Sequence, residues 1–131
     1  RQFGWASAYT DDIVNWIPAR LAVPFLALAA LLIGKSPSGL WQTVRRDAQK
    51  EKSPNSGYAE SAFAGALRVQ LGGEASYFGK PTSRPFIGTG ERSLSENTIA
   101  EAGRLMLATT VFFTAAGCLL SMLAKTPEWV L

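Results

Sequence analysis

An apolar run of 20 residues from Leu105 to Ala124 contains no charged side chain, and Arg104 and Lys125 bound it. At about 1.5 Å of rise per residue, a helix of this length is roughly 30 Å long, which matches the hydrocarbon core of a bilayer. Backbone polar groups in lipid must be satisfied within the segment, and a helix does this. The run therefore predicts a membrane-spanning helix, and it constrains the fold more than any other feature.

A second uncharged run extends from Leu21 to Gly34 and reaches about 17 residues when counted from Pro18, the lower limit for a span. Pro24 predicts a kink, because proline lacks a helix donor and clashes one turn back. A full span, a bent helix and a re-entrant segment remain open. The two runs predict an all-α, polytopic integral membrane fold, with membrane segments at about 18–34 and 105–124 joined by a polar helical and loop region at about 35–104.

Within the polar region, turn residues and helical periodicity alternate. The expected elements are an amphipathic helix at 41–50, a turn at 53–57, a helix at 58–71 stopped by two glycines, a loop at 73–90, and an early start of the last helix at a capping box formed by Ser93 and Glu96, with Pro127 as its end.

Residue counts exclude several kinds of chemistry. The chain has no histidine, so it contains neither a Ser-His-Asp site nor a histidine metal site. Its single cysteine, Cys118, lies in the apolar run and cannot form an internal disulfide. The net charge of +3 could suggest nucleic acid, but basic and acidic residues are interleaved and no nucleic-acid motif is present. No nucleic-acid partner is expected.

Asp11 and Asp12 directly precede the first apolar segment, with Asn15 and Arg20 close behind. One aspartate could cap a helix and Arg20 could extend to the membrane interface, but this leaves the second aspartate and Asn15 unexplained. Adjacent carboxylates are costly near lipid unless a cation neutralises them. Magnesium, which prefers oxygen ligands and water, is the expected cation.

The turn Ser53-Pro54-Asn55-Ser56-Gly57 is followed by Glu60, one helical turn further on. Glu60 could act as a base or ligand, or it could simply be stabilised by the helix dipole. The glycine-rich stretch from Gly72 to Lys80 does not have the spacing of a P-loop. A nucleotide site here is therefore not of the Walker type.

Several motifs together carry a family resemblance. They are Asp-Asp-x-Val-Asn-x-x-Pro-Ala-Arg at 11–20, Ser-Pro-Asn-x-Gly at 53–57, Glu60, Ala64-Gly65-Ala66-Leu67-Arg68, Leu71-Gly72-Gly73, Tyr77-Phe78-Gly79 and Pro85-Phe86-Ile87-Gly88. Their order and approximate spacing resemble the C-terminal part of the CobD/CbiB family of adenosylcobinamide-phosphate synthases. The resemblance implies that residues 1–131 are the C-terminal part of a single membrane-embedded synthase domain, whose N-terminal part supplies further helices.

The resemblance also implies an activity. Such a synthase joins adenosylcobyric acid to an amino-alcohol, typically 1-amino-2-propanol phosphate, with ATP as the energy source and Mg²⁺ as the metal. A carboxylate resists attack by an amine, so activation as an acyl phosphate is the expected route. The implied location is the bacterial inner membrane, crossed several times, with a cytoplasmic active site. A corrinoid transporter and a non-catalytic membrane regulator or scaffold of the same fold remain alternatives.

Charge suggests the roles of the residues. Asp11 and Asp12 are expected to hold magnesium, Glu60 to act as the base, and Asn55 and Asp12 to take part in catalysis. The remaining expected site residues bind substrate, and they are Asn15, Arg20, Arg68, Tyr77 and Lys80. Arginine is suited to phosphate and carboxylate through its planar fork.

The predicted topology raises a difficulty. If both apolar runs span the membrane once, residues 1–17 lie across it from the 35–104 region. Basic residues at the membrane ends of that region place it in the cytoplasm. For Asp11 and Asp12 to share a site with Asn55, the first segment must be re-entrant, or the aspartates must lie in a polar cavity near the membrane.

Overall fold

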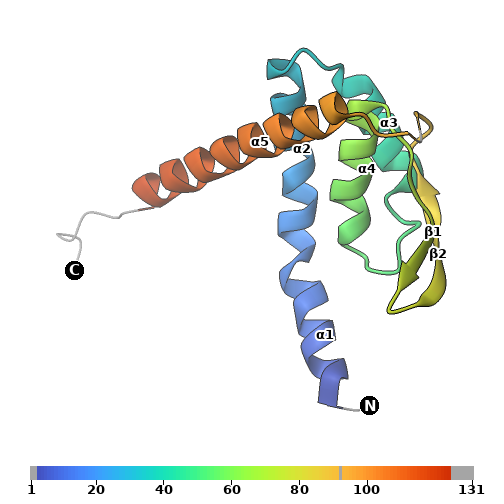
Figure 1. The fold of residues 1–131 in the computed structure, drawn as a ribbon. Coiled ribbons are helices and arrows are strands. Elements are labelled where there is room, and N and C mark those ends of the chain that lie inside the picture. Colours follow the sequence, from blue (N-terminus) through green and yellow to red (C-terminus); the bar gives the residue numbers. More distant parts are fainter. Residues whose placement is uncertain (1–2, 92, 125–131) are drawn as a thin grey trace.

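The computed structural model describes residues 3–91 and 93–124, apart from the side chains of Phe3 and Tyr77. Its elements, in chain order, are α1 (Phe3–Val14), α2 (Trp16–Leu32), α3 (Pro37–Asp47), α4 (Ser56–Leu67), β1 (Leu71–Tyr77), β2 (Lys80–Ile87) and α5 (Glu96–Leu123). Figure 1 shows α3 and α4 beside α2, the β-hairpin on their outer side, and α5 crossing α2 near its C-terminal end.

The helix that contains the first apolar segment is longer than expected. Helical hydrogen bonds continue across Asn15, from Asn15 N to Asp11 O and from Ala19 N to Asn15 O, each 3.0 Å long. Residues Gly4–Leu32 are therefore long and apolar enough, as one helix, to cross a membrane. The helix thus begins before residue 18, because Pro18 falls in the first turn of α2, where the missing N–H costs little. The membrane segment at about 18–34 stays a prediction. The helix also continues through Pro24.

The polar region folds back along α2 as a helical hairpin. Helices α3 and α4 meet at glycines: a Cβ on Gly65 would lie 2.5 Å from the carbonyl oxygen of Gly39. Such close backbone approach lets short helices bury small residues tightly. The core between the helices is mainly Val23, Leu26, Ala27, Ala29, Ala30, Leu40, Val44, Ala48, Ala62, Ala66 and Leu105.

The expectation of an all-α chain with a loop at 73–90 is corrected by an antiparallel two-stranded sheet. Its two-residue turn, Phe78-Gly79, has positive φ at both positions (50° and 75°), as a tight hairpin turn of the type I′ class requires. The strands are mostly exposed, so they lack the alternating apolar pattern that announces a strand.

The boundaries of two helices also differ from the predictions. Helix α4 ends at Leu67, before the two glycines, because Arg68 takes a left-handed conformation (φ 56°) and its carbonyl accepts a hydrogen bond from Glu91 N. The N-cap of α5 is Ser95, whose hydroxyl accepts from Thr98 N, and not Ser93. Pro127 lies outside the described residues.

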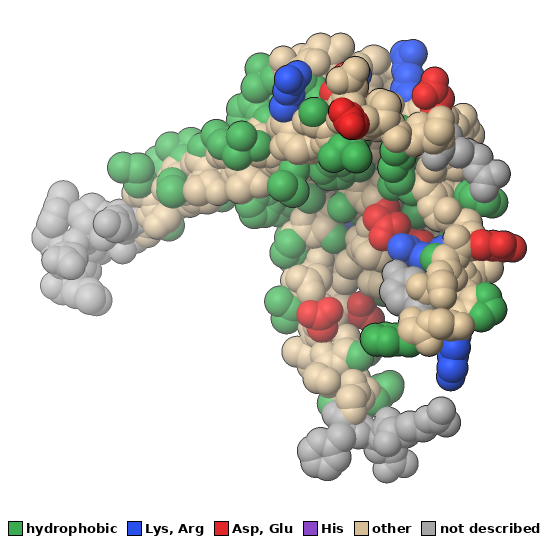
Figure 2. All heavy atoms as spheres, viewed as in Figure 1, with side chains coloured by type: hydrophobic (Ala, Val, Ile, Leu, Met, Phe, Trp, Pro, Cys, Tyr) green, Lys and Arg blue, Asp and Glu red, His purple; other side chains and the backbone are tan. Residues whose placement is uncertain are grey.

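Helix α5 contacts the rest of the fold from its start as far as Phe113. Lys35 pairs with Glu101 at 2.7 Å, and Phe25 contacts Phe113 edge to face. In the last ten residues of α5 the large apolar side chains are exposed, as Figure 2 shows where this helix extends away from the other elements. By length and composition, Glu96–Leu123 is the second candidate membrane span among the described residues.

Candidate functional site

The turn at 53–57 lies against the junction of α1 and α2. Asn55, which is 8% exposed, donates from Nδ2 to the backbone oxygen of Asp12 at 2.8 Å and accepts at Oδ1 from Arg20 Nη1 at 3.3 Å. Gly57 lets the turn approach α3, since a Cβ there would lie 2.0 Å from Ala48 O. The structure thus brings together two motifs that are about 40 residues apart in the sequence.

The Arg20 side chain is held on several sides. Its guanidinium carbon lies 4.0 Å from the ring centre of Trp16 and 4.4 Å from that of Tyr58, distances at which cation–π attraction operates. It also donates to Trp16 O at 2.8 Å. Arg20 lines a small hollow together with Glu51 and other polar residues. Its remaining donors are therefore pre-organised to bind an oxyanion or carboxylate.

Asp11 and Asp12 do not share a hollow. Consecutive residues on a helix point about 100° apart, and residues of the turn at 53–56 line the hollow on each side. Asp11 lines a hollow with Asn15, Ser53 and Asn55, whereas Asp12 lines an apolar hollow with Trp16 and Pro54 among others. Asn15 Nδ2 donates to Asp11 Oδ1 at 2.8 Å.

This arrangement bears on the expected magnesium. Within the described part of the chain, no three carboxylate or cysteine side chains cluster closely enough to hold a metal ion. Magnesium commonly uses one or two carboxylates and keeps several waters. The hollow beside Asp11 is lined by one carboxylate and by Asn15 and Ser53, which also carry side-chain oxygens, whereas the amide oxygen of Asn55 is already bonded to Arg20. These residues fit such an ion, and the joint use of Asp11 and Asp12 stays a prediction.

Glu60 is paired with an arginine that the sequence analysis did not single out. Arg84 Nη2, on β2, lies 3.0 Å from Glu60 Oε1 and 2.9 Å from Glu51 Oε1. Hydrogen bonds to Glu60 and then to Glu51 raise the pKa of Arg84. To act as a base, Glu60 has to release this partner, because an arginine stabilises the charged carboxylate. Only recognition of the hairpin could have revealed Arg84.

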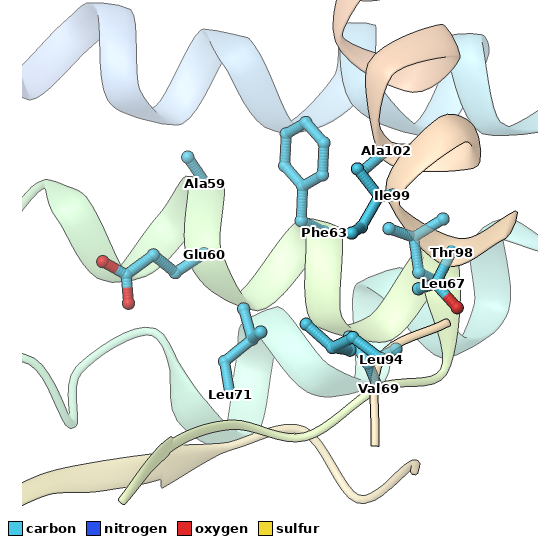
Figure 3. A pocket seen from close by; sticks show the side chains of 10 residues that line it. All are labelled: Ala59, Glu60, Phe63, Leu67, Val69, Leu71, Leu94, Thr98, Ile99 and Ala102. Carbon is cyan, nitrogen blue, oxygen red and sulfur yellow. The ribbon is translucent and has the colours of Figure 1, made fainter. Parts of the chain in front are cut away.

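Glu60 also borders an apolar hollow of about 380 Å³ between α4, β1 and the start of α5. Figure 3 shows the apolar side chains of Phe63, Leu67 and Ile99 converging there, while the Glu60 carboxylate points away from them. The hollow therefore offers an apolar surface next to a charged pair.

Among the other predicted substrate-binding residues, Arg68 lies apart from Asn55. Arg68 follows the last residue of α4, and the 12 residues of that helix span about 18 Å. Lys80 is exposed and directly follows the hairpin turn, where it pairs with Tyr77 in the strand register. The Tyr77 side chain lies outside the described part of the structure.

Asp47 is a fully buried carboxylate that the sequence analysis also missed. It accepts from Arg46 Nε and Nη2 at 2.7 and 2.6 Å, from Lys50 at 2.8 Å and from Gly88 N at 2.8 Å. The hydrogen bonds from Arg46, and after them those from Lys50 and Gly88, hold the pKa of Asp47 well below its usual range despite burial. Asp47 thus joins α3 to the end of β2 and positions the hairpin that carries Arg84.

Fold and site together define a mostly helical protein with two helices apolar enough to cross a bilayer and a polar site held against the first of them. The chain belongs to the family described as CobD/Cbib protein, whose family model matches residues 1–106. The expected family is therefore confirmed.

Curated relatives agree with this assignment. The chain is 46% identical to the cobalamin biosynthesis protein CobD of Geobacter metallireducens over 129 residues, which cover 98% of this chain and 38% of that protein. It is 42% identical to CobD of Listeria monocytogenes serovar 1/2a (86% and 36%) and 41% identical to CbiB of Salmonella choleraesuis (95% and 40%). The chain thus spans less than half the length of these relatives. No solved structure matches it at a significant level.

Proposed function

We propose that this chain forms part of a membrane-bound synthase of cobalamin biosynthesis. The reaction is the formation of an amide between a carboxylate of adenosylcobyric acid and the amine of an amino-alcohol such as 1-amino-2-propanol phosphate. The names of the relatives support the pathway, and the resemblance in the motifs supports the reaction. The observation that carries the proposal is the hydrogen-bonded link from Asp12 through Asn55 to Arg20.

The site residues have distinct parts in this proposal. Arg20, held between two rings, binds a carboxylate or phosphate of the substrates. Asn55 orients this arginine and keeps the turn against α1. Glu60 receives the proton that the amine loses, once Arg84 is drawn away from it. When bound, ATP and magnesium would activate the carboxylate as an acyl phosphate, and the amine would then displace phosphate as the amide bond forms. Asp11 and Asn15 would hold the ion, with Asp12, which lines the neighbouring hollow, as the predicted second carboxylate.

The site also bears on topology. Because α3 and α4 fold back along α2, the turn at 53–57 meets the middle of the helical stretch Gly4–Leu32. We place the site in a polar cavity bordered by that helix and open to the inner membrane's cytoplasmic side, where ATP is available. In this proposal the first segment need not be re-entrant.

The test uses the full-length enzyme in membranes with adenosylcobyric acid, ATP, magnesium and aminopropanol phosphate, and amide product is measured. Asp12→Asn keeps the backbone oxygen that Asn55 binds and removes only the charge. It is expected to abolish product while the protein stays in the membrane at normal abundance.

Asp11→Asn, assayed in parallel, shows whether the hollow lined by Asp11 or the hollow lined by Asp12 takes part in the reaction. Glu74→Gln, an exposed change on β1, is the control and should keep full activity. Wild-type turnover in both aspartate variants would contradict the metal role, and absence of amide product in the wild type would contradict the synthase assignment.

A further inference from the structure

A second polar hollow lies at the end of α4 opposite Asn55. It has a volume of about 370 Å³, and α3, the C-terminal end of α4 and the segment after β2 form its walls. Its main polar lining residues are Ser36, Ser38, Gln42, Arg46, Arg68 and Thr89. The length of α4, about 18 Å, separates it from the Asp12–Asn55–Arg20 link.

The charge in this hollow is positive. Two arginines line it and no carboxylate does. The nearest acid, Asp47, is fully buried behind Arg46 and takes up two of the five N–H donors of that guanidinium. The Arg68 guanidinium has no hydrogen bond or ion pair with any residue in the described ranges. Both side chains therefore retain donors for a ligand.

The backbone conformation of Arg68 also supports a functional role for this residue. Its φ of 56° lies in the left-handed region, which is unfavourable for a residue other than glycine. Glycine would fill this helix C-cap without that cost. Backbone strain of this kind is concentrated at functional sites, and here it presents an unpaired guanidinium to the hollow.

The hollow is also rigidly built. Gly65 of α4 sits against the backbone of α3, where an added Cβ would lie 2.7 Å from the Cα of Leu40. Gly90 lies directly against the Arg68 carbonyl in the same way. These close approaches fix the backbone of α3, which carries Arg46, relative to the backbone at Arg68, directly after α4.

We propose that this hollow is a second, separate oxyanion site that binds a terminal phosphate group. Two guanidinium forks together with hydroxyl and amide donors suit the several oxygens of a phosphate dianion better than a single carboxylate. The identity of its carrier, a phosphorylated substrate, rests on the proposed function. The presence of the site does not.

Binding is tested with inorganic phosphate on the full-length enzyme in phosphatidylcholine nanodiscs, at constant ionic strength set with chloride. The readout is the midpoint of thermal unfolding. Phosphate is expected to raise the wild-type midpoint saturably. Arg68→Gly removes the guanidinium and relaxes the left-handed backbone, so it should weaken phosphate binding at least about 10-fold while its midpoint in chloride stays equal or rises.

Arg45→Gln is the matched control, because Arg45 is an exposed arginine on α3 that does not line the hollow. It should keep the wild-type response. A wild type that does not respond to phosphate, or an Arg68→Gly variant that responds equally, overturns the proposal.

A second arm uses nanodiscs containing phosphatidylglycerol. One outcome would identify the occupant as a lipid headgroup and refute a phosphorylated substrate. In it, the anionic lipid raises the unfolding midpoint of the wild type but not that of Arg68→Gly, and added phosphate causes no further rise. Since no turnover is measured, the failure of amide synthesis would leave these results unaffected.

Discussion

Removal of the buried Asp47 carboxylate is the most direct test of how the hairpin is held. Asp47→Ala leaves Gly88 N–H without its acceptor, which costs about 1–3 kcal/mol for a buried donor. Breaking a buried ion pair costs about 3–5 kcal/mol. The side chains of Arg46 and Lys50 are 46% and 42% exposed, so water solvates their charges when the carboxylate is removed. The expected loss is therefore near the lower end, about 3 kcal/mol.

A loss of this size shifts the unfolding equilibrium about 100-fold. It is measured as the free energy of unfolding of the full-length protein in detergent, with hydrogen exchange of the 71–87 hairpin as the local readout. The hairpin should exchange faster in Asp47→Ala even under native conditions, because Gly88 no longer anchors it to α3.

The control is Glu74→Ala, which removes an exposed carboxylate from β1 itself and should change stability by no more than about 0.5 kcal/mol. If Asp47→Ala and Glu74→Ala proved equally stable, with the same hairpin exchange, the anchoring role of Asp47 would be refuted.

Two further predictions concern acid and packing. Because folding lowers the pKa of Asp47 from its ordinary 3.8, the carboxylate contributes its full stability above that pH and loses it as the pH falls toward the folded value. The gap between the unfolding midpoints of wild type and Asp47→Ala, followed from pH 6 to pH 3, should therefore stay constant down to about pH 4 and begin to narrow below it. A gap that is unchanged down to pH 3 would contradict this. Gly65→Ala should destabilise by about 1–3 kcal/mol, because its Cβ would meet α3 backbone at 2.5 Å. Gly103→Ala, with open space around it, is the control and should be neutral or stabilising by up to about 1 kcal/mol. Equal stability of the two variants would show that α3 and α4 move apart at little cost.

Several elements could be predicted because their signal is local. The apolar run after Arg104 predicted most of α5, since length and absence of charge are properties of the segment itself. The periodic stretches near Trp41 and Tyr58 likewise predicted α3 and α4, with boundaries a few residues off. The hairpin was missed because its strands carry no alternating apolar pattern, and glycine and proline content favoured a loop.

The candidate site divides in the same way. Asn55 and Arg20 were identified from motif and charge, and the structure shows them in contact. Arg84 and Asp47 were not identified, because an isolated arginine or aspartate is unremarkable until its partners are known. Arg84 acquires its role only when β2 brings it to Glu51 and Glu60.

The sequence by itself determined the family, the mainly helical character and the two apolar segments, because composition and short-range spacing carry these properties. Tertiary structure alone decided which charges meet. It placed the turn at 53–57 beside Asp12, and it directed Asp11 and Asp12 into different hollows. It also put Arg68 a full helix length away from Asn55. These outcomes depend on how α3 and α4 fold back on α2 through close glycine contacts, and such long-range packing leaves no signal within any one segment.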